Sequence, residues 1–144
     1  MMAHYRGAID SKRSVEETFD YMADFRSVTE WDPTAIEAEM LGDGPGEGTR
    51  FRVVVRLAGR ENEFLYTTLE YERPRRFVLR AETSTVVSED TVTVDAVPGG
   101  GARLVYDADL RPKGLMKLAD PVLGLMFKRL GDNAADGLRR ALGS

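Results

Sequence analysis

The sequence contains no cysteine and only one histidine among its 144 residues. Without cysteine the chain forms no disulfide, has no thiolate metal site and offers no cysteine nucleophile. A cysteine-free chain fits a reducing compartment, so we expect a cytoplasmic location.

Long apolar runs are also missing. The longest strongly apolar stretch, residues 122–127, is far shorter than the about 20 residues that a helix needs to cross a bilayer. The N-terminal segment MMAHYRGAIDSKRS lacks the apolar core of a signal peptide. We therefore expect a soluble protein without a transmembrane segment.

Charge of one sign is not concentrated anywhere in the chain. The net charge of −4 is spread without large blocks of one sign, so the basic face that nucleic acid requires is missing. We expect no nucleic-acid partner.

Glycine, by contrast, is concentrated in the stretch GDGPGEG at residues 42–48. Phosphate-binding loops use such glycines, but they lead into a helix and carry a Lys-Ser/Thr pair. Here residues 49–57 follow, in which apolar residues alternate with arginines as they do in a strand. The glycine stretch is therefore predicted to be a turn between two strands.

The chain before residue 111 reads as one strand, two helical segments and six further strands. HYRGAI predicts the first strand, residues 14–22 a helix with a capping box of Ser14 and Glu17, and residues 25–29 a short helical turn. Extended segments follow at 35–41, 49–57, 62–71, 76–82, 86–97 and 103–110. Their connections are too short for parallel crossovers, so we predict an antiparallel meander within a single domain, residues 1–144.

Residues 115–142 carry the longest helical pattern. Pro121 predicts a kink in this helix, and Gly124, Gly131 and Gly137 each weaken it by about 1 kcal/mol relative to alanine. Packing of its apolar side on the sheet must compensate. That apolar side is predicted to consist of Leu115, Ala119, Val122, Leu123, Met126, Leu130, Ala134 and Ala141.

The order of the predicted elements and four segments of the sequence resemble those of a known superfamily. The stretches are FDYMADFRSVTEWDP, LGDGPGEGTRF, LEYERPRRFVL and LRPKGLMKLADPVLGLMFKRLGDNAADGLRRAL. They look like bacterial SRPBCC (START-like) proteins of the polyketide cyclase/dehydrase and lipid transport type, including those named after a component of carbon monoxide dehydrogenase. These segments specify turns, helix boundaries and packing faces, and none of them indicates a particular reaction.

The resemblance implies an α+β fold of the helix-grip (START/SRPBCC) type. In this fold a curved antiparallel β-sheet of about seven strands wraps around a long C-terminal helix, and two short helices follow strand 1. It also implies a cavity between the sheet and the long helix that takes lipids, polyketides or other hydrophobic molecules.

Strand alternation predicts which side chains face this cavity. The strand at 62–71 is ambiguous, because Phe64, Tyr66 and Thr68 compete with Leu65, Leu69 and Tyr71; we favour Tyr66, and a bulge would let both sets contribute. Continuing the register of the neighbouring strands places Ser88 and Asp90 inward. The other predicted inward residues are Phe51, Val53, Val55, Leu57, Phe77, Leu79, Ala81, Val92, Val94, Leu104, Tyr106, Ala108 and Leu110.

The predicted ligand-binding residues combine this face with the long helix. Trp31, Tyr66 and Tyr106 pair an apolar body with a polar tip, although Trp31 serves equally well as an anchor of the short helices. Asn133, at the edge of the helix's apolar side, contacts either an internal partner such as Tyr106 or a ligand. The full set is Trp31, Phe51, Val53, Val55, Tyr66, Phe77, Leu79, Val92, Tyr106, Val122, Met126, Leu130 and Asn133.

Catalytic and metal-binding patterns are sparse. His4 is interpreted as an ordinary strand residue, and one histidine without cysteine forms no recognisable metal cluster, so we expect no metal and no cofactor. If the protein is an enzyme, Asp90 and Tyr106 are the candidates for proton transfer in an apolar pocket, because burial raises the pKa of a carboxyl group.

Three functions follow. The first is binding or transport of a hydrophobic small molecule such as a lipid or polyketide, without catalysis. The second is a polyketide cyclase, aromatase or dehydratase, and the third is an accessory subunit or assembly factor of a larger enzyme. A homodimer and a partner in an enzyme complex both remain open.

Overall fold

The computed structural model describes the backbone of residues 3–57, 59–114 and 120–143, and the side chains of residues 4–57, 59–114 and 125–143. In chain order the elements are β1 (Ala3–Ser11), α1 (Val15–Ala23), the short 3-10 helix η1 (Phe25–Ser27), α2 (Val28–Trp31), β2 (Ala35–Leu41), β3 (Arg50–Leu57), β4 (Arg60–Glu72), β5 (Arg76–Glu82), β6 (Val86–Ala96), β7 (Ala102–Pro112) and α3 (Asp120–Gly143). Every predicted strand is present within two residues of its predicted bounds.

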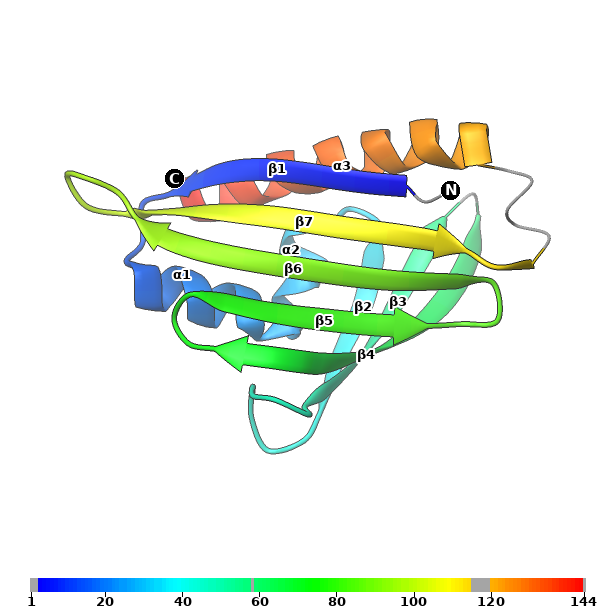
Figure 1. Ribbon diagram of the computed structural model, residues 1–144, viewed down its shortest axis with the longest axis horizontal. Helices are drawn as coiled ribbons and strands as arrows, with labels where there is room; N and C mark the ends of the chain where they lie inside the picture. The colour runs from blue at the N-terminus through cyan, green and yellow to red at the C-terminus, as the bar shows by residue number, and fades with distance from the viewer. Residues whose placement is uncertain (1–2, 58, 115–119, 144) are drawn as a thin grey trace.

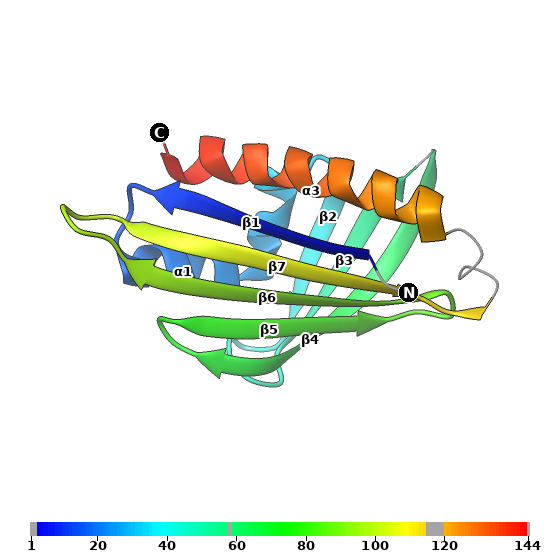
Figure 2. The same ribbon diagram turned by 45° about the horizontal axis from the view of Figure 1, so that its top comes forward.

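The seven strands form one antiparallel sheet in the order β1-β7-β6-β5-β4-β3-β2. Strands β2 to β7 follow one another as a meander, and β1 pairs with β7. The sheet curls, α3 lies along β1 and contacts α2, and α1 packs against β6 and β7 (Figures 1 and 2). This is the helix-grip fold that the sequence predicts.

Two local devices predicted from the sequence are present. Helix α1 begins at the capping box, with Glu17 N–H donating to Ser14 Oγ at 3.1 Å and Ser14 N–H donating to Glu17 Oε1 at 3.2 Å. The glycine stretch joins β2 to β3, and Gly48 adopts a φ of +87° while its N–H donates to the Thr68 carbonyl at 2.8 Å. Only glycine takes this left-handed conformation readily, so the stretch serves as a turn.

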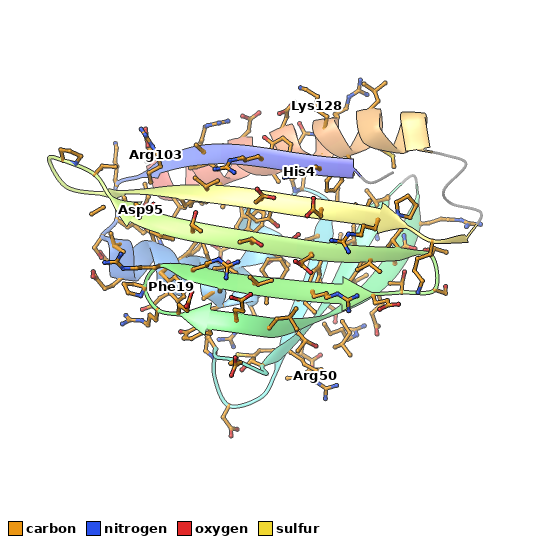
Figure 3. The ribbon with its side chains drawn as sticks, in the orientation of Figure 1. His4, Phe19, Arg50, Asp95, Arg103 and Lys128 are labelled. Carbon is orange, nitrogen blue, oxygen red and sulfur yellow. The ribbon has the colours of Figure 1, made fainter. Side chains whose placement is uncertain are left out.

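The charged side chains of the sheet gather on its outer face (Figure 3). Arg52 bridges Glu63 at 2.8 Å and Glu37 at 3.0 Å, and Arg56 contacts Glu61 at 2.9 Å. These arginines therefore lie on the outer surface of the sheet. Exposed pairs of this kind contribute little to stability, so the fold depends on its concave side.

Strand β4 changes its inward set partway along. Tyr66 and Thr68 are buried, whereas Leu65 and Leu69 are 41% and 42% exposed. A register shift between Thr68 and Glu70 then turns Tyr71 inward, where its ring meets Phe19 at 5.3 Å. The bulge that the sequence left as an alternative is thus present, and it lets Tyr66 and Tyr71 both contribute to the interior while Leu65 and Leu69 stay exposed.

Helix α3 packs through its glycines. A Cβ on Gly137 would lie 1.9 Å from the carbonyl oxygen of Trp31, and one on Gly131 would lie 2.3 Å from the ring of Tyr5. Both positions therefore allow a close approach that any side chain would block. The glycines lower the helix propensity of α3, and they also make possible the close packing that compensates for this loss.

The predicted orientation of α3 requires a correction. Its most deeply buried residues are Ala135, Leu138 and Leu142, none of which is on the predicted apolar side, whereas Met126 is 41% exposed. Relative to the prediction, the helix is rotated so that the face containing Gly131 packs against the rest of the protein. Close contact at this face decides the orientation, and a hydrophobicity pattern misses it because glycine has no weight in such a pattern.

Two other predictions about α3 concern its beginning. The described part of α3 runs from Asp120 to Gly143, and the kink predicted at Pro121, at the edge of this part, stays a prediction. The predicted start at residues 115–119 and the side chains of Val122, Leu123 and Gly124 lie outside the described part of the chain.

We predict that Gly137→Ala destabilises the protein by about 1–3 kcal/mol, because the added methyl group forces α3 away from Trp31. This loss outweighs the about 1 kcal/mol that alanine gains in helix propensity. Urea unfolding followed by circular dichroism measures the change.

Gly143→Ala is the matched control. A Cβ there comes no closer than 3.9 Å to a neighbouring atom, the carbonyl oxygen of Asp10, so its stability should change little. A Gly137→Ala protein as stable as the wild type would contradict the proposed role of this contact.

Candidate functional site

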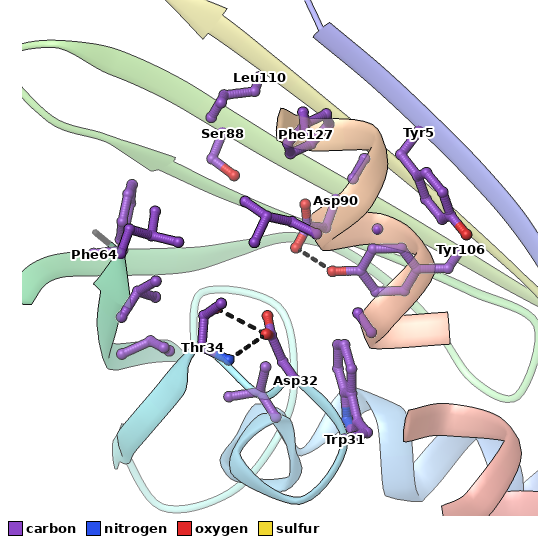
Figure 4. Close-up of a pocket in the computed structure, with 18 of the residues that line it drawn as sticks. Tyr5, Trp31, Asp32, Thr34, Phe64, Ser88, Asp90, Tyr106, Leu110 and Phe127 are labelled. Atoms are coloured by element: carbon purple, nitrogen blue, oxygen red, sulfur yellow. Dashed lines mark hydrogen bonds between the residues drawn. The ribbon is translucent and has the colours of Figure 1, made fainter. Parts of the chain in front are cut away.

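A cavity of about 290 Å³ lies between the concave face of the sheet and α3. Its walls come from β1, η1, α2, β3, β4, β6, β7 and α3, and they are mostly aromatic and aliphatic. Figure 4 shows its polar groups, Asp32, Thr34, Ser88, Asp90 and Tyr106, among these apolar side chains. Met126, 41% exposed, also lines the cavity and lies towards the N-terminal end of α3.

Eight of the predicted catalytic and ligand-binding residues line this cavity. Asp90 and Tyr106 were the catalytic candidates. The predicted ligand contacts among them are Trp31, Val53, Val55, Tyr66, Tyr106, Met126 and Leu130. The structure brings these side chains together, and their contact with a ligand remains a prediction.

Four predicted ligand contacts belong to the solid core instead. Phe51, Phe77, Leu79 and Val92 are each at most 1% exposed and do not line the cavity. The reason is that α3 covers only part of the concave face, while α1 and η1 fill the rest. Phe77 meets Phe19 of α1 edge-to-face at 5.6 Å, and Phe51 meets Phe25 of η1 at 6.2 Å.

Two predicted contacts come from α3. Asn133 is exposed and does not line the cavity, because the helix is rotated as described above, and Tyr106 donates its hydrogen bond to Asp90 instead. The side chain of Val122 lies outside the described residues.

The sequence interpretation missed Asp32 as a cavity residue. Its carboxylate accepts hydrogen bonds from the N–H and Oγ1 of Thr34, at 2.9 and 2.8 Å, directly after α2. The signal in the sequence, an aspartate before proline with threonine two residues later, predicts a turn. It carries no information on what the turn faces.

Asp90 and Tyr106 form a hydrogen-bonded polar pair in the cavity wall. Alternation along β6 and β7 turns both inward, and Ala108, which is opposite Asp90 in the register, leaves space above the carboxyl group. The Tyr106 hydroxyl donates to Asp90 Oδ2 at 2.6 Å, and the ring of Tyr106 packs against Trp31 at 5.5 Å. Nearby, Tyr66 and Ser88 share a hydrogen bond of 3.1 Å between their hydroxyl groups.

Burial changes the acid–base properties of this pair. Desolvation raises the pKa of Asp90 to about 7, against the opposing effect of the hydrogen bond from Tyr106, and the negative charges of Asp32, Asp109 and Glu89 raise it further. Desolvation also raises the pKa of Tyr106 well above its usual value. Asp90 is thus poised to exchange a proton near neutral pH while Tyr106 remains a hydrogen-bond donor.

His4 lies outside this cavity, on the exposed side of β1. Strand pairing brings its Nε2 to 2.6 Å from Asp107 Oδ1, so an ordinary strand residue acquires a carboxylate partner. His4, Asp107 and Asp109 each place one potential metal-ligand atom within 4.8 Å of the others. His4 is exposed and paired with Asp107, which accounts for its position without an ion.

The curved sheet, the long helix and the cavity between them define a START-like, helix-grip protein. The profile of the polyketide cyclase/dehydrase and lipid transport family matches residues 2–143, and the chain belongs to this family. A comparison with the curated proteins found no match. Among the described helices, none has the length and hydropathy that crossing a lipid bilayer requires.

Solved structures share this fold at low sequence identity. A START superfamily protein from Mycobacterium smegmatis is 18% identical with a TM-score of 0.72, over 96% of this chain and 92% of that one. The Zhui aromatase/cyclase from Streptomyces sp. R1128 is 15% identical with a TM-score of 0.69, over 98% and 96%. A protein from Deinococcus radiodurans is 14% identical with a TM-score of 0.68, over 99% and 95%.

We predict that Asp90 makes the protein less stable as the pH rises from about 4 to 7. The folded protein keeps the Asp90 proton up to about pH 7, whereas the unfolded chain releases it near pH 4. The contribution is therefore fully present below pH 4 and is lost as the pH rises to 7, by at most about 1.4 kcal/mol per pH unit. Urea unfolding at several pH values measures it.

Asp90→Asn should remove this slope, while Asp95→Asn, a change of an exposed carboxyl group on the same strand, should keep it. Parallel stability profiles for the wild type and Asp90→Asn would contradict the raised pKa.

Proposed function

We propose that the protein binds a hydrophobic small molecule, such as a lipid or polyketide, in the cavity under α3. The observation that carries this proposal is the cavity itself, about 290 Å³ lined mostly by apolar side chains with a few polar groups among them. Ligand sites in proteins have this composition, and this cavity has about the smallest volume usual for them. It is roughly twice the volume of a cavity that holds benzene.

Because the cavity lining is mostly apolar, burial of the ligand's apolar surface favours binding. Each methylene group that leaves water for the cavity contributes about 0.8 kcal/mol, or about a fourfold gain in affinity. The family profile, whose description includes lipid transport, and the fold shared with a START superfamily protein support the same function.

We predict that a series of linear alcohols binds with affinity rising about fourfold per added carbon until the chain fills the cavity. Calorimetry gives the affinities. The emission of Trp31 reports the location, because it is the single tryptophan of the chain and lines the cavity.

Two neighbouring positions of α3 provide a matched pair for this experiment. Ala134→Phe places an aromatic ring in the cavity and should stop the rise at a shorter chain, whereas Asn133→Phe places the same ring on the exposed side and should not. Alcohols that leave Trp31 emission unchanged, or affinities that do not depend on chain length, would refute the proposal.

A second candidate function is acid–base catalysis on a ketone-bearing substrate. The specific observation is the pair of Asp90 and Tyr106, in which a carboxyl group of pKa about 7 accepts a hydrogen bond from a tyrosine inside an apolar cavity. Ionised Asp90 would accept a proton from carbon beside a carbonyl; the Tyr106 hydroxyl, released by Asp90 once that carboxyl group is protonated, would then donate its hydrogen bond to the resulting enolate oxygen. The fold shared with an aromatase/cyclase is consistent with this chemistry.

For this second candidate, we predict that Asp90→Asn and Tyr106→Phe each lower turnover of a poly-ketone by at least about 100-fold, the usual contribution of a positioned acid or base. Alcohol binding should persist in both variants, since the apolar walls are intact. Product formation is followed by mass spectrometry. Wild-type protein that leaves poly-ketones unchanged, or variants that turn over normally, would remove the catalytic assignment.

A further inference from the structure

The ionisable side chains that line the cavity carry one sign of charge. Asp32 enters from the segment after α2 and Asp90 from β6, and no described residue lining the cavity is lysine, arginine or histidine. Figure 4 shows both carboxyl groups on the side of the cavity where Tyr106 lies. The charged residues that act on the Asp90 carboxyl group, namely Asp32, Asp109 and Glu89, are also acidic.

The partners of the two carboxyl groups are neutral. Asp90 accepts a hydrogen bond from the Tyr106 hydroxyl, and Asp32 accepts two from Thr34. Such bonds satisfy oxygen lone pairs but supply no positive charge. In a low-dielectric cavity, two carboxylates without a counter-ion are costly, and the cost is relieved either by protonation or by a cation.

Aromatic rings stand beside these carboxyl groups. Trp31 and Tyr106 line the cavity and meet edge-to-face at 5.5 Å with an interplanar angle of 72°, and the ring of Tyr66 lines it as well. Ring faces attract ammonium groups independently of carboxylates. An acidic pair flanked by aromatic rings therefore favours a cationic group, while a ligand carboxylate would become a third negative charge in the same space.

We infer that Asp32, Asp90 and Tyr106 form a subsite for the protonated amine of an otherwise apolar ligand. This inference rests on the proposed binding function and adds the chemical class of the ligand: an amine with an aliphatic or aromatic body. A fatty acid, whose head carries the opposite charge, is the ligand that the subsite rejects.

The test compares three probes that share one chain and differ only in the head: decylamine, 1-decanol and decanoate. Titrations near pH 8 and moderate salt keep the amine protonated and Asp90 mostly ionised. Calorimetry and Trp31 emission are measured together. We expect decylamine to bind at least about tenfold more tightly than decanol, and decanol more tightly than decanoate, as for a charge-assisted hydrogen bond in a desolvated site.

Three variants locate the preference. Asp32→Asn and Asp90→Asn, which keep the shape of the side chain, should each reduce the ratio of decylamine to decanol affinity by about tenfold. Asp95→Asn removes the same charge from an exposed position near the end of β6 and should leave the ratio unchanged (Figure 3). This control separates the subsite from general attraction of an amine to a protein with a net charge of −4.

The outcomes distinguish the two proposals. If decanol binds and decanoate matches or exceeds decylamine, the amine subsite is wrong while the binding function stands. If decylamine is preferred equally by the wild type and both Asn variants, the assignment to Asp32 and Asp90 is wrong. If no probe changes Trp31 emission or releases heat, the binding function itself fails, and the inference fails with it.

Discussion

The architecture depends on the contact between α3 and the backbone of Trp31. Gly137 brings the helix so close to the Trp31 carbonyl that no side chain would fit, and Gly131 does the same beneath the ring of Tyr5. Leu138 and Leu142 are then buried, and Leu142 accepts a hydrogen bond from the N–H of Lys12 at 2.9 Å. The C-terminal half of α3 is thereby fixed, whereas Leu125 and Met126 in its other half remain 69% and 41% exposed.

The cavity is the part of the concave face that this arrangement leaves unfilled. At one end of the sheet, Phe19 and Phe25 fill the interior against Phe77 and Phe51. At the other end the helix spans the sheet above Val53 and Val55 without filling the space between. The polar groups lie on the walls of this unfilled part. The pKa of the Asp90 carboxyl group is raised there because the group is removed from water and no cation among the described residues compensates for the lost hydration.

Much of the fold is readable from the sequence because its signals are local. The capping box at Ser14, the glycine turn before β3 and the alternation in β3 each depend on a few neighbouring residues. A bulge in β4 was one of the alternatives that the sequence left open, since two apolar sets of opposite parity occupy this strand; the shift turns only Tyr71 of the second set inward.

The division between core and cavity was not readable in the same way. Phe51 and Val53 have the same parity on one strand, yet one is packed under η1 and the other lines the cavity. Alternation specifies a face, whereas cavity lining depends on which helix covers that part of the face. The orientation of α3 escaped prediction for a related reason: it is set by the close approach at Gly131 and Gly137, and glycine has no side chain for a hydrophobicity pattern to count.

The extra residue in β4 separates two tasks within one strand. Before the shift at Leu69, Tyr66 lies over the cavity; after it, Tyr71 closes the core against Phe19. Each half of the strand follows its own alternation. A single inserted residue thus lets one strand line the cavity along part of its length and close the packed core along the rest.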